Sequence, residues 1–221
     1  MDKIYSGHKP LNQSRTRSYR RFIVLFRDPL ERLISSYVDS FHHEGMDDTE
    51  YRAIFDLRNN RTSGAHCSSA ERCFVAGYVY MMTNWRRVHS RGCQVKMMNG
   101  YSCFQSVVVT QAMVDNAVNL ISNNYMKSQY DGRGNVTFYS GVFERYNESI
   151  RYFHHVAGKG TAPLPIEFVK FRESAGRDKG KASKELLRRI NRDNNYSDPY
   201  DTVLYERANQ ILNDNVRILN E

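Results

Sequence analysis

The segment from residue 22 to residue 41 constrains the fold more than any other part of this chain. It opens with an uninterrupted apolar run over residues 22–26, which is typical of a strand buried on both faces of a parallel sheet. Residues 27–29 break the run, and there Asp28 suits the N-cap and Pro29 the first turn of a helix. Apolar residues then recur at the spacing of an amphipathic helix: Leu30, Leu33, Ile34, Tyr37, Val38 and Phe41. The segment therefore predicts a strand, a tight turn and a helix.

The rest of the chain continues the same alternation. A second buried strand is expected over Val136–Phe143, followed by a helix over Glu144–Val156. Further helices are expected over residues 74–88, around residues 113–121, over 183–190 with Ser183 as the cap, and from Asp198-Pro199 onward, whereas 44–73 read mainly as loop. Strands that alternate with helices predict an α/β fold with a mainly parallel sheet flanked by helices. Residues 1–221 show no repeat or boundary and are interpreted as a single domain.

The overall charge narrows the choice of partners. The net charge is +8, which favours polyanions but does not choose among them. The chain has no recognition-helix pattern, zinc finger or aromatic RNA-binding motif, so nucleic acid is not expected as a partner. No apolar stretch approaches the roughly 18 residues of a membrane span, and the first residues lack the apolar region of a signal peptide. A membrane anchor is expected only in a region upstream of this sequence.

Cysteines and glycosylation triplets indicate a compartment. The four cysteines form two local pairs, Cys67 with Cys73 and Cys93 with Cys103, and both are predicted to be disulfides. Five Asn-x-Ser/Thr triplets begin at Asn12, Asn60, Asn135, Asn147 and Asn195. Together these features favour a secretory lumen. A zinc site at the first pair is the alternative, because His66 adjoins it, but the spacings differ from those of structural zinc sites. No metal is therefore expected.

The turn at residues 27–29 predicts a phosphate site. In open α/β sheets, ligands bind beyond the carboxyl ends of the strands. Arg27 stands at such an end, next to the N-terminus of the following helix, and a guanidinium forms strong paired hydrogen bonds with phosphate. Ser35 lies about two helical turns further on and offers a hydroxyl to the same anion. The alternative is that Arg27 only forms a turn and that Ser35 is exposed.

The same residues carry a resemblance to a known family. Phe22-Ile-Val-Leu-Phe-Arg27-Asp-Pro-Leu-Glu-Arg-Leu-Ile-Ser35-Ser-Tyr37 resembles the 3′-phosphate-binding motif of sulfotransferases that use 3′-phosphoadenosine 5′-phosphosulfate. It is similar in particular to the membrane-bound carbohydrate branch, which includes heparan sulfate 2-O-sulfotransferase. Weaker resemblances cover residues 94–100, 138–149 and 201–208. The resemblance implies a nucleotide-kinase-like sulfotransferase fold in which Arg27 and Ser35 hold the 3′-phosphate of the donor.

The resemblance also implies an activity and a location. It implies transfer of a sulfuryl group to a glycan or proteoglycan hydroxyl in the Golgi lumen, by a protein that is membrane-anchored in its full-length form. Tyr5-Ser-Gly7-His8 is similar to a Gly-His that supplies the catalytic base in the 2-O-sulfotransferase type, and a neutral imidazole suits that role. Arg172 corresponds to a basic segment that lies over the cofactor, and Lys96 is a further candidate for an anion contact. The alternatives are a terminal residue for His8 and a solvated loop for Arg172.

One family feature was not found in this sequence. The loop that holds the 5′-phosphosulfate, a Lys/Arg-x-Gly-Thr-Thr-like turn after the first strand, is expected some tens of residues before His8. The chain is therefore expected to be an N-terminally incomplete sulfotransferase domain that lacks the first strand and this loop. A second interpretation stays open, in which the chain is a catalytically inactive remnant that binds a nucleotide or an acidic glycan.

Overall fold

The structure of the protein, a computed structural model, describes most of the chain in separate segments. They are residues 21–38, 69–85, 91–103, 105–123, 125–127, 135–156, 160–168 and 177–219.

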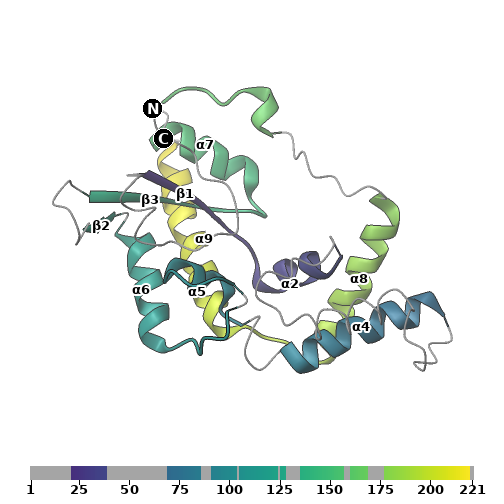
Figure 1. The fold of residues 1–221 in the computed structure, drawn as a ribbon. Helices are drawn as coiled ribbons and strands as arrows, with labels where there is room; N and C mark the ends of the chain where they lie inside the picture. The colour runs from purple at the N-terminus through teal and green to yellow at the C-terminus, as the bar shows by residue number, and fades with distance from the viewer. Residues whose placement is uncertain are drawn as a thin grey trace.

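The described strands form one three-stranded sheet in the order β1-β3-β2 (Figure 1). Strand β1 (Arg21–Phe26) pairs in parallel with β3 (Asn135–Val142). Their register runs from Arg21 opposite Thr137 to Phe26 opposite Val142. The short strand β2 (Tyr125–Lys127), which the sequence did not predict, pairs antiparallel with β3. The parallel β1–β3 pair within a helix-rich chain is compatible with the predicted α/β class, but the sheet of the described residues is mixed rather than mainly parallel.

The described helices lie beside this sheet and extend beyond one end of it (Figure 1). The described helices are α2 (Pro29–Val38), α4 (Ala70–Trp85), α5 (Cys93–Met98), α6 (Gln111–Ser122), α7 (Tyr146–Val156), the 3-10 helix η1 (Pro165–Phe168), α8 (Arg177–Asp193) and α9 (Pro199–Leu219). None of these described helices is both long and apolar enough to cross a membrane.

Most predicted elements are confirmed, but two helix starts were wrong. Helix α4 begins at Ala70, inside the region predicted to be loop. Ser69 caps this start, because its side-chain hydroxyl accepts the Arg72 N–H and its backbone carbonyl accepts the Cys73 N–H. Helix α8 begins at Arg177, six residues before the predicted cap at Ser183. The sequence prediction treated Ser183 as the residue that caps the start of the helix, although serine is also tolerated inside a helix.

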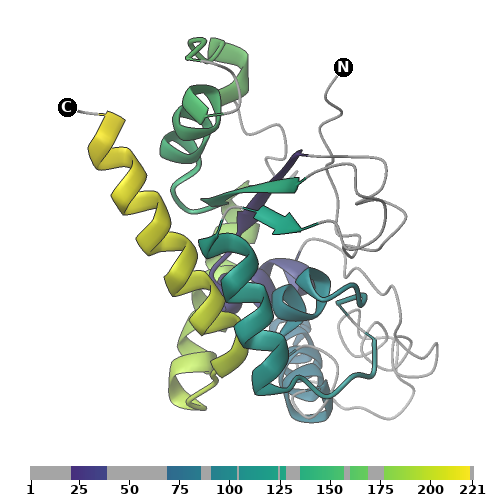
Figure 2. The same cartoon turned by 90° about the vertical axis from the view of Figure 1, so that its left-hand side faces the viewer.

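The first core cluster joins the sheet to α5, α6, α7 and α9, and α9 runs alongside both the sheet and α6 (Figure 2). Phe22 of β1 and Phe138 of β3 stack at the centre, with ring centroids 5.4 Å apart. Gly141 allows α7 to approach β3 closely, since a Cβ atom there would lie 2.7–2.8 Å from Phe153 and Ser149. The Ser149 hydroxyl donates to the backbone carbonyl of Val142 and accepts its N–H. The end of β3 is thus fixed to the start of α7.

The second core cluster joins α2, α4 and α8, which gather at the end of the molecule away from α7 (Figure 1). Tyr37 of α2 and Tyr78 of α4 are fully buried, with ring centroids 5.1 Å apart. The Tyr37 hydroxyl donates to the Phe74 carbonyl, and the Asn191 side chain of α8 donates to the Tyr78 hydroxyl. Burial raises the pKa of Tyr78 well above its usual value. This cluster anchors the far end of α2, whose first turn belongs to the candidate site.

Candidate functional site at the carboxyl ends of the parallel strands

The parallel strands end side by side, and a helix starts after each of them. The Phe143 N–H, just past β3, donates to the carbonyl of Phe26, the last residue of β1, over 2.7 Å. Arg27 follows β1 directly and precedes α2, while Glu144 lies between β3 and α7. This is the edge at which open α/β sheets bind their ligands. The sequence predicted the end of the first strand correctly but did not predict which groups of the second strand would face it.

The first turn of α2 is capped by its own sequence. The Asp28 carboxylate accepts the N–H groups of Leu30 and Glu31, each over 2.9 Å, which confirms the predicted N-cap. The Asp28 carbonyl accepts the Arg32 N–H over 2.8 Å. The N–H donors that a helix start could offer to an anion therefore already have acceptors here. A phosphate at the start of α2 would therefore depend on side chains rather than on the amides of this helix.

Arg27 is held in place while remaining partly open to solvent. Its guanidinium lies over the Phe143 ring, 4.8 Å from the centroid, and its Nε lies 3.7 Å from Glu144 Oε1. The Arg27 side chain is 26% exposed and that of Glu144 is 31% exposed. Glu144 also accepts the Asp28 N–H with both oxygens at 3.3 Å. The site thus presents an oriented cation together with a carboxylate that competes with an incoming anion.

Gln94 of α5 joins this site through the backbone of Arg27. Its side-chain oxygen accepts the Arg27 N–H over 2.8 Å, and its side-chain nitrogen donates to the Arg27 carbonyl over 2.8 Å. Gln94 itself is buried. Sequence reasoning noted the segment 94–100 only as a resemblance, because nothing local in the sequence signals a contact across 67 residues.

Ser35, the second predicted phosphate ligand, is 9% exposed and counts among the buried residues of α2. The alternative of an exposed Ser35 was therefore wrong. Six residues separate it from Pro29, which corresponds to about 9 Å of rise along the helix. Only a small part of this side chain is open to a ligand in the described conformation.

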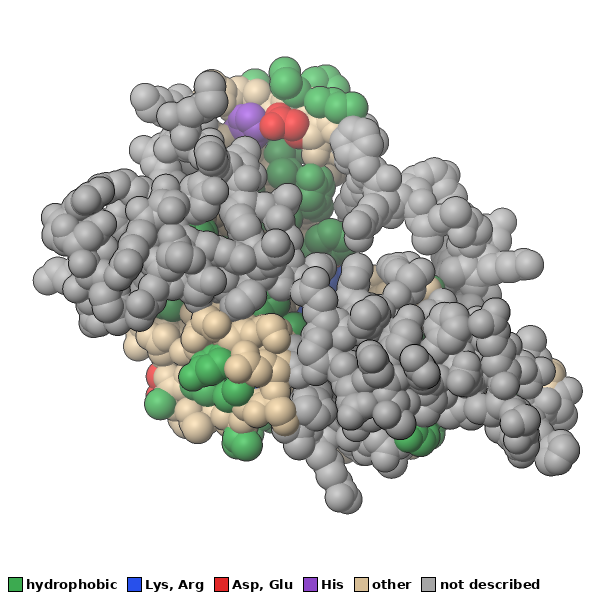
Figure 3. All heavy atoms as spheres, in the orientation of Figure 1, with side chains coloured by type: hydrophobic (Ala, Val, Ile, Leu, Met, Phe, Trp, Pro, Cys, Tyr) green, Lys and Arg blue, Asp and Glu red, His purple; other side chains and the backbone are tan. Residues whose placement is uncertain are grey.

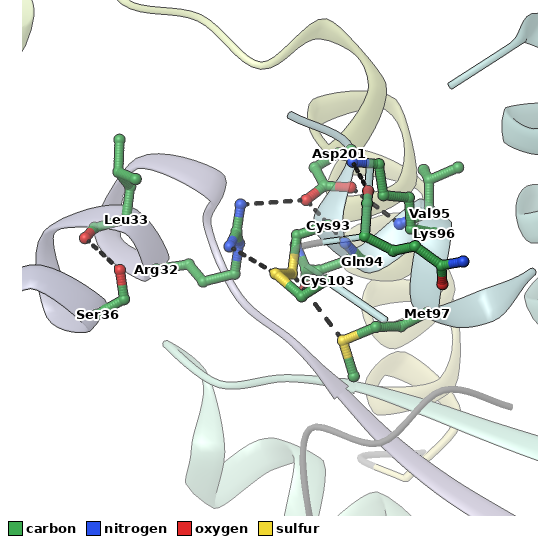
Figure 4. The surroundings of a disulfide bond; sticks show 12 residues. Arg32, Leu33, Ser36, Cys93, Gln94, Val95, Lys96, Met97, Cys103 and Asp201 are labelled. Atoms are coloured by element: carbon green, nitrogen blue, oxygen red, sulfur yellow. Dashed lines mark hydrogen bonds and ion pairs between the residues drawn. A yellow bond between two sulfur atoms is a disulfide. The ribbon is translucent and has the colours of Figure 1, made fainter. Parts of the chain in front are cut away.

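A buried ionic cluster lies at the start of α5, next to the Cys93–Cys103 disulfide (Figure 4). Arg32 of α2 places its guanidinium 3.6 Å from a carboxylate oxygen of Asp201 and 3.9 Å from one of Asp198. Its other terminal nitrogen donates to the Cys103 sulfur over 3.6 Å. The disulfide confirms the second predicted cysteine pair. Cys67 lies outside the described residues, so the Cys67–Cys73 pair stays a prediction.

The two carboxylates of this cluster also fix the start of α5. Asp201 accepts the Gln94 and Val95 N–H groups over 3.0 and 2.9 Å, and Asp198 accepts the Gly92 N–H. Burial, and then the neighbouring Asp198, raise the pKa of Asp201 to about 6.

Lys96 lies in the same cluster and is fully buried. Its amine donates to the Gln105 carbonyl over 3.1 Å, and burial lowers its pKa. These contacts place Lys96 in the protein interior, although the sequence suggested an anion contact for it.

A third polar cluster lies on the surface over α7 and η1, where a histidine and an acidic side chain adjoin (Figure 3). His154 contacts the Thr161 hydroxyl through Nδ1 at 3.1 Å and the Glu167 carboxylate through Nε2 at 3.0 Å. The Leu164 N–H, followed by His154, lowers the pKa of Glu167. Its partners come from a separate turn, so no local sequence pattern indicates these contacts.

Two predicted site residues, His8 and Arg172, lie outside the described residues, so the structure does not place them. Within the described segments, no group of three or more His, Cys, Asp or Glu side chains is arranged to hold a metal ion. Comparison with models of known protein families gave no match to this sequence, and comparisons with curated proteins and with solved structures also gave no match.

Proposed function

We propose that this chain is a sulfotransferase domain that transfers a sulfuryl group from 3′-phosphoadenosine 5′-phosphosulfate to a glycan hydroxyl. The observation that carries the proposal is the position of Arg27. The guanidinium of the phosphate-binding motif stands at the shared carboxyl edge of two parallel strands, partly exposed and oriented by Phe143 and Glu144. The finer assignment to a nucleotide-kinase-like sulfotransferase fold is part of this proposal and rests on the sequence resemblance.

The proposed reaction assigns each group a role. The acceptor hydroxyl attacks the sulfur of the donor, the bond from sulfur to the 5′-phosphate oxygen breaks, and 3′-phosphoadenosine 5′-phosphate leaves. His8 takes the proton of the acceptor hydroxyl. Arg27 binds the 3′-phosphate with Ser35 beside it, and Arg172 covers the nucleotide. Such transfer relies mainly on positioning and on charge stabilisation, so it requires no metal here.

The described residues fit the 3′-phosphate end of the donor in part. Arg27 supplies a reachable guanidinium, the type of group that binds phosphate through paired charge-assisted hydrogen bonds. Two features weaken anion binding at this edge. The first-turn amides of α2 already donate to Asp28, and the Glu144 carboxylate repels an anion near Arg27. Weak binding with strong dependence on Arg27 is therefore expected.

Calorimetry with 3′-phosphoadenosine 5′-phosphate, the stable by-product, tests the nucleotide site. We expect binding that is lost in Arg27→Ala and that is much weaker for adenosine 5′-phosphate, which lacks the 3′-phosphate. Arg189→Ala is the matched control, because Arg189 is an exposed arginine on α8. Equal binding of the two nucleotides by the folded wild type would refute a 3′-phosphate site at Arg27.

The second candidate is a catalytically inactive domain of the same fold, and the use of the α2 amides by Asp28 favours it. A transfer assay separates the two. Labelled sulfate moving from the donor to a panel of desulfated glycans, and lost in His8→Ala, supports the enzyme. Nucleotide binding without any transfer supports the inactive domain.

A further inference from the structure

We infer that Gln94 is a positioning residue for the proposed phosphate site, acting by fixing the backbone from which Arg27 projects. The inference deepens the proposed function and rests on it. It is carried by a pair of hydrogen bonds that neither the motif nor the proposed reaction uses.

The geometry around Arg27 explains why such a residue is needed. In the part of the chain that the structure describes, β1 is an edge strand, paired only with β3. Backbone groups of successive strand residues point to opposite sides. Because the Phe26 carbonyl faces β3, where it accepts the Phe143 N–H, the N–H and carbonyl of Arg27 face the other, unpaired side. Gln94 satisfies both of these groups at 2.8 Å, as a neighbouring strand would.

Hydrogen bonds to α9 fix the position of Gln94 in turn. Its backbone N–H donates to Asp201 of α9 over 3.0 Å, and the next N–H, from Val95, donates to the same carboxylate. Gln94 is 8% exposed and Asp201 is fully buried, so solvent offers few substitutes for these contacts. A continuous series of hydrogen bonds therefore links the first turn of α9 to the backbone of Arg27.

The amide of glutamine suits this task because it carries an acceptor and a donor on one planar group. Leucine at this position would fill a similar volume but would leave the Arg27 N–H and carbonyl without these partners. The backbone would then be free to rotate, and the guanidinium would lose its fixed direction. Small displacements of a binding group reduce function strongly, so we expect on the order of a tenfold loss in the preference for the 3′-phosphate.

The test compares two nucleotides rather than one affinity. The ratio of the Kd for adenosine 5′-phosphate to that for 3′-phosphoadenosine 5′-phosphate is measured for wild type, Gln94→Leu and Gln111→Leu. Gln111 is an exposed glutamine of α6 and serves as the matched control. The ratio should fall about tenfold in Gln94→Leu alone, whereas general loss of folded protein would weaken both nucleotides equally and leave the ratio unchanged.

A second variant decides the matter if Gln94→Leu does not fold. In Gln94→Glu, an ionised carboxylate accepts the Arg27 N–H but cannot donate to the Arg27 carbonyl, whereas a protonated one can do both. Burial at this position raises the pKa of the introduced carboxyl group, so relative to wild type at the same pH this variant should show a low ratio at about pH 8 and recover towards about pH 5.

The outcomes distinguish a failure of the proposed function from a failure of the positioning role of Gln94. A wild-type chain without preference for the 3′-phosphate overturns the proposed function and this inference with it. A wild-type preference that Gln94→Leu retains, or a Gln94→Glu ratio that does not depend on pH, overturns the positioning role alone.

Discussion

Two arginines five residues apart, Arg27 and Arg32, stand in opposite environments. Arg27 is 26% exposed and faces one carboxylate at 3.7 Å, whereas Arg32 is 13% exposed and faces the two fully buried carboxylates of Asp198 and Asp201. An exposed pair contributes little to stability because water competes for both charges. A buried pair that loses one partner leaves an uncompensated charge. Of these two arginines, only Arg27 is therefore open to a ligand, and Arg32 holds α2, α5 and α9 together.

The largest expected effect tests this contrast directly. Arg32→Met should lower the free energy of unfolding by about 3–5 kcal/mol, because it removes the guanidinium that faces two buried carboxylates. Arg27→Met should lower it by less than about 1 kcal/mol. Urea denaturation of both variants gives the comparison. Similar losses of stability in the two variants would show that burial does not determine which of the two arginines stabilises the fold.

The next largest effect is expected from the Cys93–Cys103 disulfide, which lies beside Arg32 in the buried cluster. It closes a loop with a sequence separation of 10, for which chain entropy predicts about 2–3 kcal/mol of stabilisation. Cys93→Ala, Cys103→Ala and the double variant should all lose this amount in urea denaturation, since each breaks the same bond. Wild-type stability in the double variant would contradict a bonded pair.

The pH dependence of stability tests the buried carboxylates. The pKa of Asp201 is about 6 in the folded protein, against an ordinary value of 3.8. Between these values the folded state keeps a proton that the unfolded chain has released, so this group makes stability fall as the pH rises from about 4 to about 6. The expected fall is on the order of 2 kcal/mol.

The matched variant for this prediction is Asp201→Asn, which cannot titrate. Its free energy of unfolding should be lower at every pH, because it loses a backbone acceptor, but its profile between about pH 4 and pH 6 should be flatter than that of wild type. Parallel profiles for the two proteins would place the titrating group elsewhere.

The smallest expected effect concerns the exposed arginine. Glu144→Gln keeps an acceptor for the Asp28 N–H but removes the charge that faces Arg27. If Arg27 binds a phosphate as proposed, 3′-phosphoadenosine 5′-phosphate should bind about two- to fivefold more tightly, as expected for an exposed ion pair. Glu206→Gln, at an exposed glutamate of α9, is the control. Weaker binding in Glu144→Gln would instead mean that Glu144 holds Arg27 in its binding orientation.

The sequence by itself determined the local features of this protein. The apolar run at residues 22–26, the cap at Asp28, the second strand and the helices that follow were predictable because period, capping and turn chemistry act over a few residues. The Cys93–Cys103 pair was predictable for the same reason, as its members are close in the chain.

The tertiary structure decided which of these features meet. Gln94 reaches Arg27 across 67 residues, and Asp201 reaches Gln94 across 107. His154 pairs with a separate turn, and Ser35 is buried where the sequence allowed it to be exposed. Contacts of this kind depend on how whole elements pack, and no local pattern carries that information. The candidate site therefore owes Arg27 to its sequence motif, and the orientation of Arg27 to packing.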